Sequence, residues 1–395
     1  MENFELCLPT RVIFGKSTEN HVGEFVNEYF AARGETPGKI LLVYGGGSIT
    51  RSGLYDRVCV SLTMAGVDYE ELSGVHPNPS LPKVYEGIDI VRKEDIKFIL
   101  AVGGGSVIDT AKAVAAGAGY DGDVWDFYVK KATLTHALPV GVVLTIPAAG
   151  SEGSGNSVIT NEEAKIKVGI RYPNILRPVF SVLNPELCRT LPPAQMANGA
   201  CDMFCHVLER YFSHSEHTEA TDALCEAAFR TIVQTARALK KDMKDYDAWA
   251  NLMWCGTVAH NGMLGVGRVE DWGSHALEHA LSARYPHIAH GAGLAVVAPA
   301  WLKHTRTLNP RRFTDFAVKV FGVDPAGKDE NTVALAGISA FEEWLREIGL
   351  ATRLHTLGLD NSLFAEMAAA VGGAAPGNFL KLTAEDALAI YKLAM

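Results

Sequence analysis

The segment Phe-Ile-Leu-Ala-Val-Gly-Gly-Gly-Ser-Val-Ile-Asp-Thr-Ala-Lys, residues Phe98 to Lys112, decides the fold of the first half of the chain. An apolar run enters a glycine turn, and a helical pattern leaves it. Glycines let a backbone approach a phosphate closely, and the free N–H groups of a helix N-terminus attract the anion. The segment therefore predicts a dinucleotide site formed by Gly103, Gly104, Gly105, Ser106 and Asp109. The spacing differs from GxGxxG, so a turn without a ligand is the alternative.

A second glycine loop follows the apolar run Ile40–Tyr44 and consists of Gly45, Gly46, Gly47 and Ser48. Two further apolar runs, Val140–Ile146 and Phe180–Leu183, end at prolines or at Asn-Pro. Short apolar runs separated by helical patterns indicate a parallel sheet with crossover helices. Two glycine turns at strand ends fit a ligand crevice along the carboxyl edge of that sheet.

The second half of the chain is rich in Ala, Leu, Glu, Met and His and has few strand-like runs. Apolar residues recur at helical spacing over Thr218–Leu239 and Thr332–Ile348, and Pro192-Pro193 suits the start of a helix. The sequence therefore predicts two domains. Residues 1–190 form an α/β dinucleotide-binding domain with a parallel sheet, and residues 191–395 form an all-α domain.

Composition excludes several classes of function. The net charge is -9, whereas nucleic-acid binding needs clustered Lys and Arg. No long uncharged apolar stretch spans a membrane, and the N-terminus does not resemble a signal peptide. The seven cysteines form no CxxC pair, which indicates reduced thiols in a cytoplasmic protein.

Histidines and one aspartate recur at spacings that suit a metal. Asp202 and His206 lie four residues apart in a helical context, as do His275 and His279, and His290 follows. Four-residue spacing places two side chains on one face of a helix. One carboxylate and several imidazoles suit zinc or ferrous iron, although packing or surface histidines are the alternative.

Together these motifs resemble the iron-containing alcohol dehydrogenase family, in particular its butanol dehydrogenase and aldehyde reductase branch. The resemblance covers nearly the whole chain. This sequence departs from the family pattern at Ala149, where the family often has Thr. The motifs that carry it are Tyr44–Ser48, Gly103–Asp109, Pro147–Glu152, Lys167–Gly169, Val182–Pro185, Asn198–Asp202 with His206, Asp271–His275 with His279, and Ala289–Gly293.

The resemblance implies a metal-dependent dehydrogenase that transfers hydride between a nicotinamide cofactor and short to medium-chain primary alcohols or aldehydes. It implies one divalent metal, Fe²⁺ or Zn²⁺, bound by Asp202, His206, His275 and His290, in a cleft between the two domains. His279 then lies near the substrate as the candidate proton relay. Thr145 and Lys167 join the expected cofactor-binding residues, and a homodimer is expected.

The cofactor preference is predicted from the Gly45–Ser48 loop, where the resemblance places the 2′ position of the cofactor. No acidic residue follows the strand until Asp56, and Arg51 adds a positive charge, so NADP(H) is expected over NAD(H). Three alternatives stay open: an NAD-dependent polyol dehydrogenase of the glycerol type, a metal-dependent hydrolase, and a non-catalytic protein stabilised by zinc.

Overall fold

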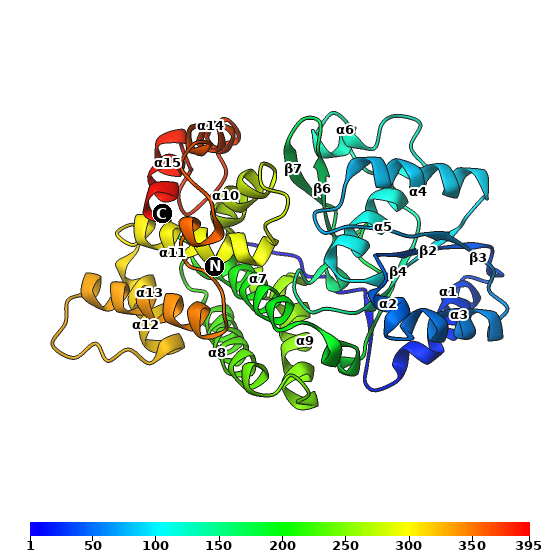
Figure 1. The fold of residues 1–395 in the computed structure, drawn as a ribbon, viewed down its shortest axis with the longest axis horizontal. Coiled ribbons are helices and arrows are strands. Elements are labelled where there is room, and N and C mark those ends of the chain that lie inside the picture. Colours follow the sequence, from blue (N-terminus) through cyan, green and yellow to red (C-terminus); the bar gives the residue numbers. More distant parts are fainter. The chain divides into compact units, whose positions relative to one another are not determined.

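The structure is a computed structural model that describes all 395 residues. The chain forms two compact units, drawn together as a ribbon in Figure 1. An α/β unit consists of Cys7–Leu191. A helical unit consists of Pro192–Met395 together with the first six residues, Met1–Leu6.

The α/β unit contains a six-stranded sheet in the order β1-β8-β5-β4-β2-β3, in which every neighbouring pair is parallel. This confirms the predicted parallel α/β fold. A separate antiparallel hairpin follows β5. The strands of the sheet are β1 Arg11–Phe14, β2 Ile40–Tyr44, β3 Tyr69–Leu72, β4 Phe98–Gly103, β5 Val140–Leu144 and β8 Phe180–Leu183, and the hairpin strands are β6 Asn156–Asn161 and β7 Ile166–Arg171.

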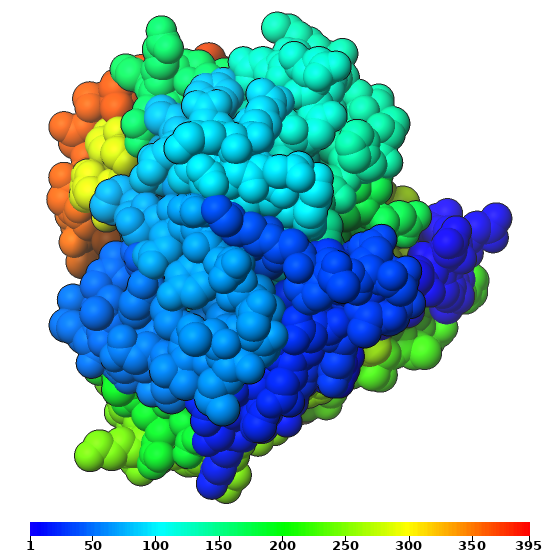
Figure 2. Space-filling view, turned by 90° about the vertical axis from the view of Figure 1, so that its right-hand side faces the viewer, coloured from blue at the N-terminus to red at the C-terminus, as the bar shows by residue number.

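Helices cover both faces of the sheet, with α4 and α5 on one side of the strands in Figure 1 and α1 and α3 on the other. Parallel strands need such crossover connections, and both faces of the sheet are then buried. Segments from the first part of the chain, blue to cyan, form most of the face seen in Figure 2. The helices are α1 Val22–Ala31, α2 Ser48–Arg51, α3 Leu54–Met64, α4 Leu81–Lys93, α5 Gly105–Ala118 and α6 Trp125–Tyr128, with short 3-10 turns at Thr18–His21, Ser151–Gly153 and Pro185–Thr190.

Alternate residues of the central strands form the core beneath α1 and α3. On β4 these are Phe98, Leu100 and Val102, which pack with residues such as Val26 and Leu62 of the covering helices. All five are at most 1% exposed. At about 25 cal/mol per Å² of buried apolar area, such side chains each contribute roughly 1.5–3 kcal/mol, so this layer stabilises β4 against the helices that cover it.

A buried lysine joins α5 to the segment that follows β5. The Nζ of Lys112 donates hydrogen bonds to the backbone oxygens of Ser151, Ser154 and Asn156 at 2.6, 2.8 and 3.0 Å, and to the Ser151 hydroxyl at 2.9 Å. Burial lowers the pKa of Lys112 to about 8, while the Asp109 and Glu152 carboxylates oppose that shift. The ammonium group therefore holds this segment against α5.

Replacing Lys112 with methionine should destabilise the α/β unit by about 3 kcal/mol or more, because buried acceptors would lose a charged donor. Thermal unfolding followed by circular dichroism measures the effect. Lys93→Met is the matched control, since the Lys93 side chain is 82% exposed. Equal melting temperatures for the two variants would show that the Lys112 network contributes nothing to stability.

The helical unit contains no strand, as its composition predicts. Its first helix, α7, begins at Pro193 and is buried almost throughout from Met196 to Tyr211. Phe204 of α7 lies at the centre of an aromatic core, stacked on Phe341 with ring centroids 4.6 Å apart. The helices are α7 Pro193–Tyr211, α8 Glu219–Lys241, α9 Tyr246–His260, α10 Gly273–Ser282, α11 His290–Thr305, α12 Pro310–Phe321, α13 Glu330–Glu347, α14 Phe364–Ala374 and α15 Ala384–Leu393, with 3-10 turns at Met263–Gly265 and Leu354–Leu357.

The predicted helical stretches at Thr218–Leu239 and Thr332–Ile348 correspond to α8 and α13 within a few residues. None of the helices combines the length and the apolar character that a membrane span requires.

Candidate metal centre and cofactor loops

Three helices of the helical unit bring one carboxylate and three imidazoles together. Asp202 and His206 lie one turn apart on α7, His275 lies in the first turn of α10, and His290 begins α11. The Oδ1 of Asp202 is 3.8 Å from the Nε2 of His206, 3.8 Å from the Nε2 of His275 and 3.6 Å from the Nε2 of His290. The four residues that the sequence predicts as metal ligands therefore converge on one point.

These four donor atoms fit a divalent metal. Ligands at about 2.0–2.1 Å in a tetrahedral site lie roughly 3.4 Å from one another, which is close to the measured separations. The Oδ1 of Asp202 and the Nε2 of His275 are buried and have no hydrogen-bond partner. Buried polar atoms are rarely left in this state, so a shared cation is the simplest partner for both atoms.

The helix ends that carry the ligands are held by close packing. Trp272 adopts a left-handed backbone conformation with φ 74°, and α10 begins at the next residue. At the start of α11, a Cβ added at Gly291 would lie only 2.1 Å from the backbone oxygen of Asn198 on α7. Glycine is therefore required for α11 to approach α7 closely enough to bring His290 to Asp202.

The imidazoles differ in their protonation. Burial lowers the pKa of His206 well below its usual value, which favours the neutral ring that a metal needs. Burial alone would also lower the pKa of His275, but the neighbouring Asp202 and Glu209 carboxylates raise it to about 9. The carboxylates around His275 are thus strong enough to hold a positive charge at this position.

His279 lies one turn after His275 on α10, and its ring centroid is 5.5 Å from that of His290. It is therefore beside the four converging side chains without being among them. A further histidine, His260 at the end of α9, was not predicted. It is 7% exposed, and its ring centroid lies 4.1 Å from that of His206. The sequence carries no spacing signal for it because α9 reaches the site only through tertiary packing.

In the α/β unit, the two predicted glycine loops follow neighbouring strands. Gly103–Ser106 covers the last residue of β4 and the start of α5, and Gly45–Ser48 follows β2, which pairs directly with β4. A Cβ at Gly104 would lie 2.4 Å from Cγ2 of Ile146, and one at Gly105 would lie 2.8 Å from Cβ of Ala149. Gly104 and Gly105 thus have no room for side chains, and their backbone stands at the N-terminus of α5, as a phosphate site requires.

The second loop is more open. A Cβ at Gly46 would meet nothing within 4 Å, whereas one at Gly47 would lie 2.8 Å from the Arg51 guanidinium. The carbonyl of Gly45 accepts a hydrogen bond from the N–H of Gly74 at 3.1 Å, which ties the loop to the segment after β3. The arrangement leaves space and a positive charge beside the loop.

The other three predicted cofactor residues lie in different surroundings. The N–H of Thr145 donates to the carbonyl of Gly103 at 3.1 Å, so Thr145 stands beside the first glycine loop. Lys167 on β7 donates to Oδ1 of Asn78 at 3.0 Å. Asp109 accepts hydrogen bonds from the Ser151 hydroxyl at 2.6 Å and the Val158 N–H at 3.0 Å, and burial raises its pKa. Asp109 of α5 is therefore joined by hydrogen bonds to the turn at Ser151 and to strand β6.

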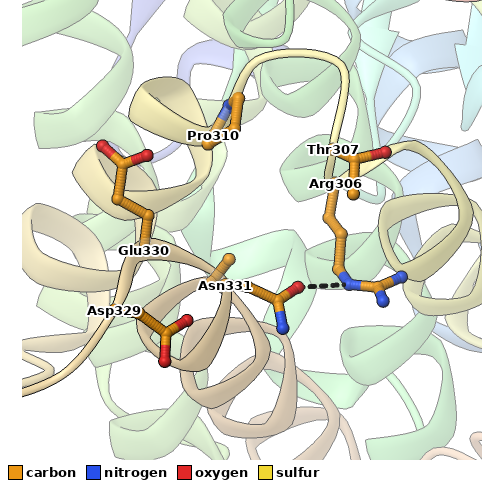
Figure 3. Close-up of a pocket in the computed structure, with 7 residues that line it drawn as sticks. Arg306, Thr307, Pro310, Asp329, Glu330 and Asn331 are labelled. Atoms are coloured by element: carbon orange, nitrogen blue, oxygen red, sulfur yellow. Dashed lines mark hydrogen bonds between the residues drawn. The ribbon is translucent and has the colours of Figure 1, made fainter.

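A surface hollow of about 430 Å³ lies elsewhere on the helical unit (Figure 3). Figure 3 shows the Arg306 guanidinium directed at Asn331, whose Oδ1 accepts a hydrogen bond from Nε at 2.8 Å. None of the predicted site residues lines it. The lining residues are Arg306, Thr307, Pro310, Asp329, Glu330, Asn331 and Ala334.

Comparison with known families gives two matches that together span most of the chain. Residues 9–185 match the family described as iron-containing alcohol dehydrogenase, and residues 196–395 match the C-terminal part of the Fe-containing alcohol dehydrogenase family. The chain belongs to the iron-containing alcohol dehydrogenase family. This confirms the resemblance seen in the sequence, and members of this family depend on a divalent metal and NAD(P)(H).

Individual relatives are similar to this chain over at least nine-tenths of its length. A probable NADH-dependent butanol dehydrogenase 1 of Bacillus subtilis (strain 168) is 43% identical, with 100% of each chain covered. An NADPH-dependent aldehyde reductase of Escherichia coli (strain K12) is 33% identical over 92% of this chain and 91% of its own. The crystal structure of NADH-dependent butanol dehydrogenase A from Thermotoga maritima matches with a TM-score of 0.94 and 42% identity, covering 100% of this chain and 99% of that one.

Proposed function

We propose that the chain interconverts short to medium-chain primary alcohols and their aldehydes, with one divalent metal bound by Asp202, His206, His275 and His290. The observation that carries this proposal is the convergence of three Nε2 atoms on one carboxylate oxygen, each 3.6–3.8 Å from the Oδ1 of Asp202. The helical unit is then the metal-binding and catalytic domain, and the α/β unit binds the dinucleotide.

The metal, when bound, supplies a Lewis acid for the alcohol or carbonyl oxygen. The chain's own residues do the rest. The backbone N–H groups at the start of α5 bind the cofactor pyrophosphate, and Gly103–Gly105 allow that close approach. The cofactor-binding set that we propose is Gly45, Gly46, Gly47, Ser48, Gly103, Gly104, Gly105, Ser106, Asp109, Thr145 and Lys167.

His279 is the residue that we propose as the proton relay, because an imidazole titrates near working pH and this one lies next to His275 and His290. The variant His279→Ala should lower kcat by roughly 10²–10⁴-fold and change the pH profile, while bound metal stays near one ion per chain. Steady-state kinetics together with metal analysis separate the two effects. Loss of the metal would instead assign His279 to the ligand set.

We propose further that the chain prefers NADP(H) to NAD(H). The support is the open Gly45–Ser48 loop without a carboxylate and the Arg51 guanidinium beside Gly47. The relatives named above include both an NADH-dependent and an NADPH-dependent enzyme, so their names do not decide the preference. Charge-assisted hydrogen bonds to the 2′-phosphate, at about 1.5–3 kcal/mol, correspond to a tenfold or greater preference in kcat/KM.

The substitution Gly46→Asp should reverse this preference, because a carboxylate in the open space at Gly46 repels the 2′-phosphate and accepts from a ribose hydroxyl. The matched control Gly46→Asn adds the same volume without the charge and should keep NADPH ahead. The ratio of kcat/KM for NADPH and NADH is measured with one aldehyde. A native enzyme that favours NADH would contradict the proposal, as would an unchanged ratio in Gly46→Asp.

The substrate class is tested by assaying butanal, longer linear aldehydes and glycerol in parallel with both cofactors. The proposal requires linear aldehydes to be the better substrates, and a large excess of activity on glycerol would assign the chain to polyols. A metal-dependent hydrolase would leave both glycine loops without a ligand. A protein that uses zinc only for stability would bind neither cofactor tightly.

We also propose a cytoplasmic homodimer. The seven cysteines are all free thiols, which suits a reducing compartment. Strand β1 is an edge strand, and the residues before and within it expose large apolar side chains: Phe4, Leu6, Leu8 and Phe14 are 55%, 41%, 39% and 42% exposed. An open edge with apolar flanks is suited to pairing with a second copy.

A further inference from the structure

Two of the four proposed metal ligands have their second ring nitrogen held by a buried glutamate. The Nδ1 of His275 donates to Oε1 of Glu209 at 2.8 Å, and the Nδ1 of His290 donates to Oε2 of Glu278. Both glutamate side chains are fully buried. In each pair the Nε2 atom of the histidine faces Asp202.

Burying a carboxylate is costly unless hydrogen bonds or a charge compensate for the lost water. A histidine whose Nδ1–H is donated to a carboxylate presents the lone pair of Nε2 to a metal, in a fixed ring orientation and with increased basicity. Glu209 and Glu278 are therefore suited to accept the Nδ1–H of histidines whose Nε2 atoms bind a metal.

The two contacts also connect the three helices of the site in series. Glu209 stands on α7, seven residues after Asp202, and also accepts from the N–H groups of Trp272 and His275 and the Ser274 hydroxyl at 2.7, 3.0 and 2.6 Å. It thus caps the start of α10 as well as holding its histidine. Glu278 stands on α10 and holds the histidine that begins α11.

Glu278 has little freedom to move. A Cβ at Gly293 would lie 2.9 Å from Cγ of Glu278, so the glutamate side chain is packed directly against α11. The helix thus keeps the carboxylate against His290.

A second cation site is the competing explanation for part of this geometry. Glu278, His279 and His290 each offer a ligand atom, and these atoms lie within 4.8 Å of one another. However, the Nε2 of His290 is 3.6 Å from Asp202 and its Nδ1 faces Glu278. One ring would then have to bind two cations at once, whereas a carboxylate–histidine–metal triad uses both nitrogens in their ordinary roles.

We infer that Glu209 and Glu278 are positioning residues that orient His275 and His290 and set the affinity of the site for its metal. This inference rests on the metal ligands in the proposed function. Loss of such an outer partner typically weakens metal binding 10–100-fold. Glu278 offers the cleaner test, because Glu209 also caps α10.

The experiment measures the Zn²⁺ dissociation constant of the full-length chain by competition with a chelating dye, for the native protein and Glu278→Gln. We expect the affinity to fall 10–100-fold in Glu278→Gln and further in Glu278→Ala, since glutamine keeps an acceptor oxygen but lacks the charge. The d–d spectrum of the Co²⁺-loaded protein should shift with it. Glu342→Gln is the matched control, because Glu342 is also buried in the helical unit but pairs with Lys303 and Arg353.

The variant His290→Ala distinguishes a failure of the proposed ligand set from a failure of the inference about Glu209 and Glu278. Native Zn²⁺ affinity in His290→Ala would contradict the ligand set itself. Loss of affinity there, with Glu278→Gln and Glu209→Gln both within twofold of native, would overturn the inference and leave the ligands standing. Two Zn²⁺ ions per native chain, falling to one in Glu278→Gln, would replace it with the second cation site.

A measurement without any substitution covers the case in which the glutamate variants do not fold. In the Zn²⁺-loaded native protein with ¹⁵N-labelled histidine, the Nδ1 atoms of His275 and His290 should carry protons and the Nε2 atoms should not. A His290 ring with an unprotonated Nδ1 would overturn the inference.

Discussion

Replacing His206 with alanine should remove the bound metal and lower kcat for aldehyde reduction at least about a thousandfold, because the metal supplies several kcal/mol of charge stabilisation and each 1.36 kcal/mol is a factor of ten. His206 lies within α7, more than one turn from either end, so the helix should persist without its imidazole. Metal content per chain and kcat are measured on the same preparation.

The control for this variant is His355→Ala, which removes an exposed histidine from the same unit. It should keep both metal and activity. If His206→Ala retained one ion per chain with native affinity, His206 would be a packing residue and the ligand set would have to exclude it.

Replacing Ser106 with aspartate should raise the KM for the cofactor at least about a hundredfold. Ser106 lies in the first turn of α5, where the backbone N–H groups would receive the pyrophosphate. Two like charges about 4 Å apart repel by about 4 kcal/mol at an effective dielectric constant of 20, which exceeds the 2.7 kcal/mol that a hundredfold change requires.

The isosteric variant Ser106→Asn separates charge from size and should change the KM much less. Initial rates are measured over a range of cofactor concentrations at saturating aldehyde. Equal KM values for the aspartate and asparagine variants would mean that the loop after β4 does not bind the phosphates.

The sequence predicts the central strands because they are buried on both faces and therefore uniformly apolar. Ile40–Tyr44 is found with the predicted bounds, and the apolar run that begins at Phe98 forms β4, which ends at Gly103. The edge strands β1 and β3 are not predicted. β3 reads Tyr-Glu-Glu-Leu, and its two glutamates, one half-buried and one exposed, interrupt the apolar run by which a strand would be recognised.

The candidate site also has features that the sequence shows and features that only the structure shows. The four-residue spacing of Asp202 and His206 is a local property of one helix, so it is visible in the sequence. The Glu209–His275 and Glu278–His290 contacts join different helices. His260 approaches His206 from α9 in the same manner. None of these three contacts corresponds to a regular spacing in the sequence. Only the packing of α7, α9, α10 and α11 reveals them.

Gly291 illustrates how packing decides the site. In the sequence it belongs to the motif Ala289–Gly293, but nothing there shows what the glycine contacts. In the structure it is the point at which α11 meets the backbone of Asn198, and the position of His290 depends on that contact.

The proposed function requires one divalent metal, held by Asp202, His206, His275 and His290, for alcohol and aldehyde chemistry. Removing all metal with a chelator and titrating Fe²⁺ or Zn²⁺ back, while following butanal reduction, tests this requirement. We expect negligible activity without metal and a linear rise that ends at one ion per chain. Full activity in the metal-free protein would rule out a catalytic metal.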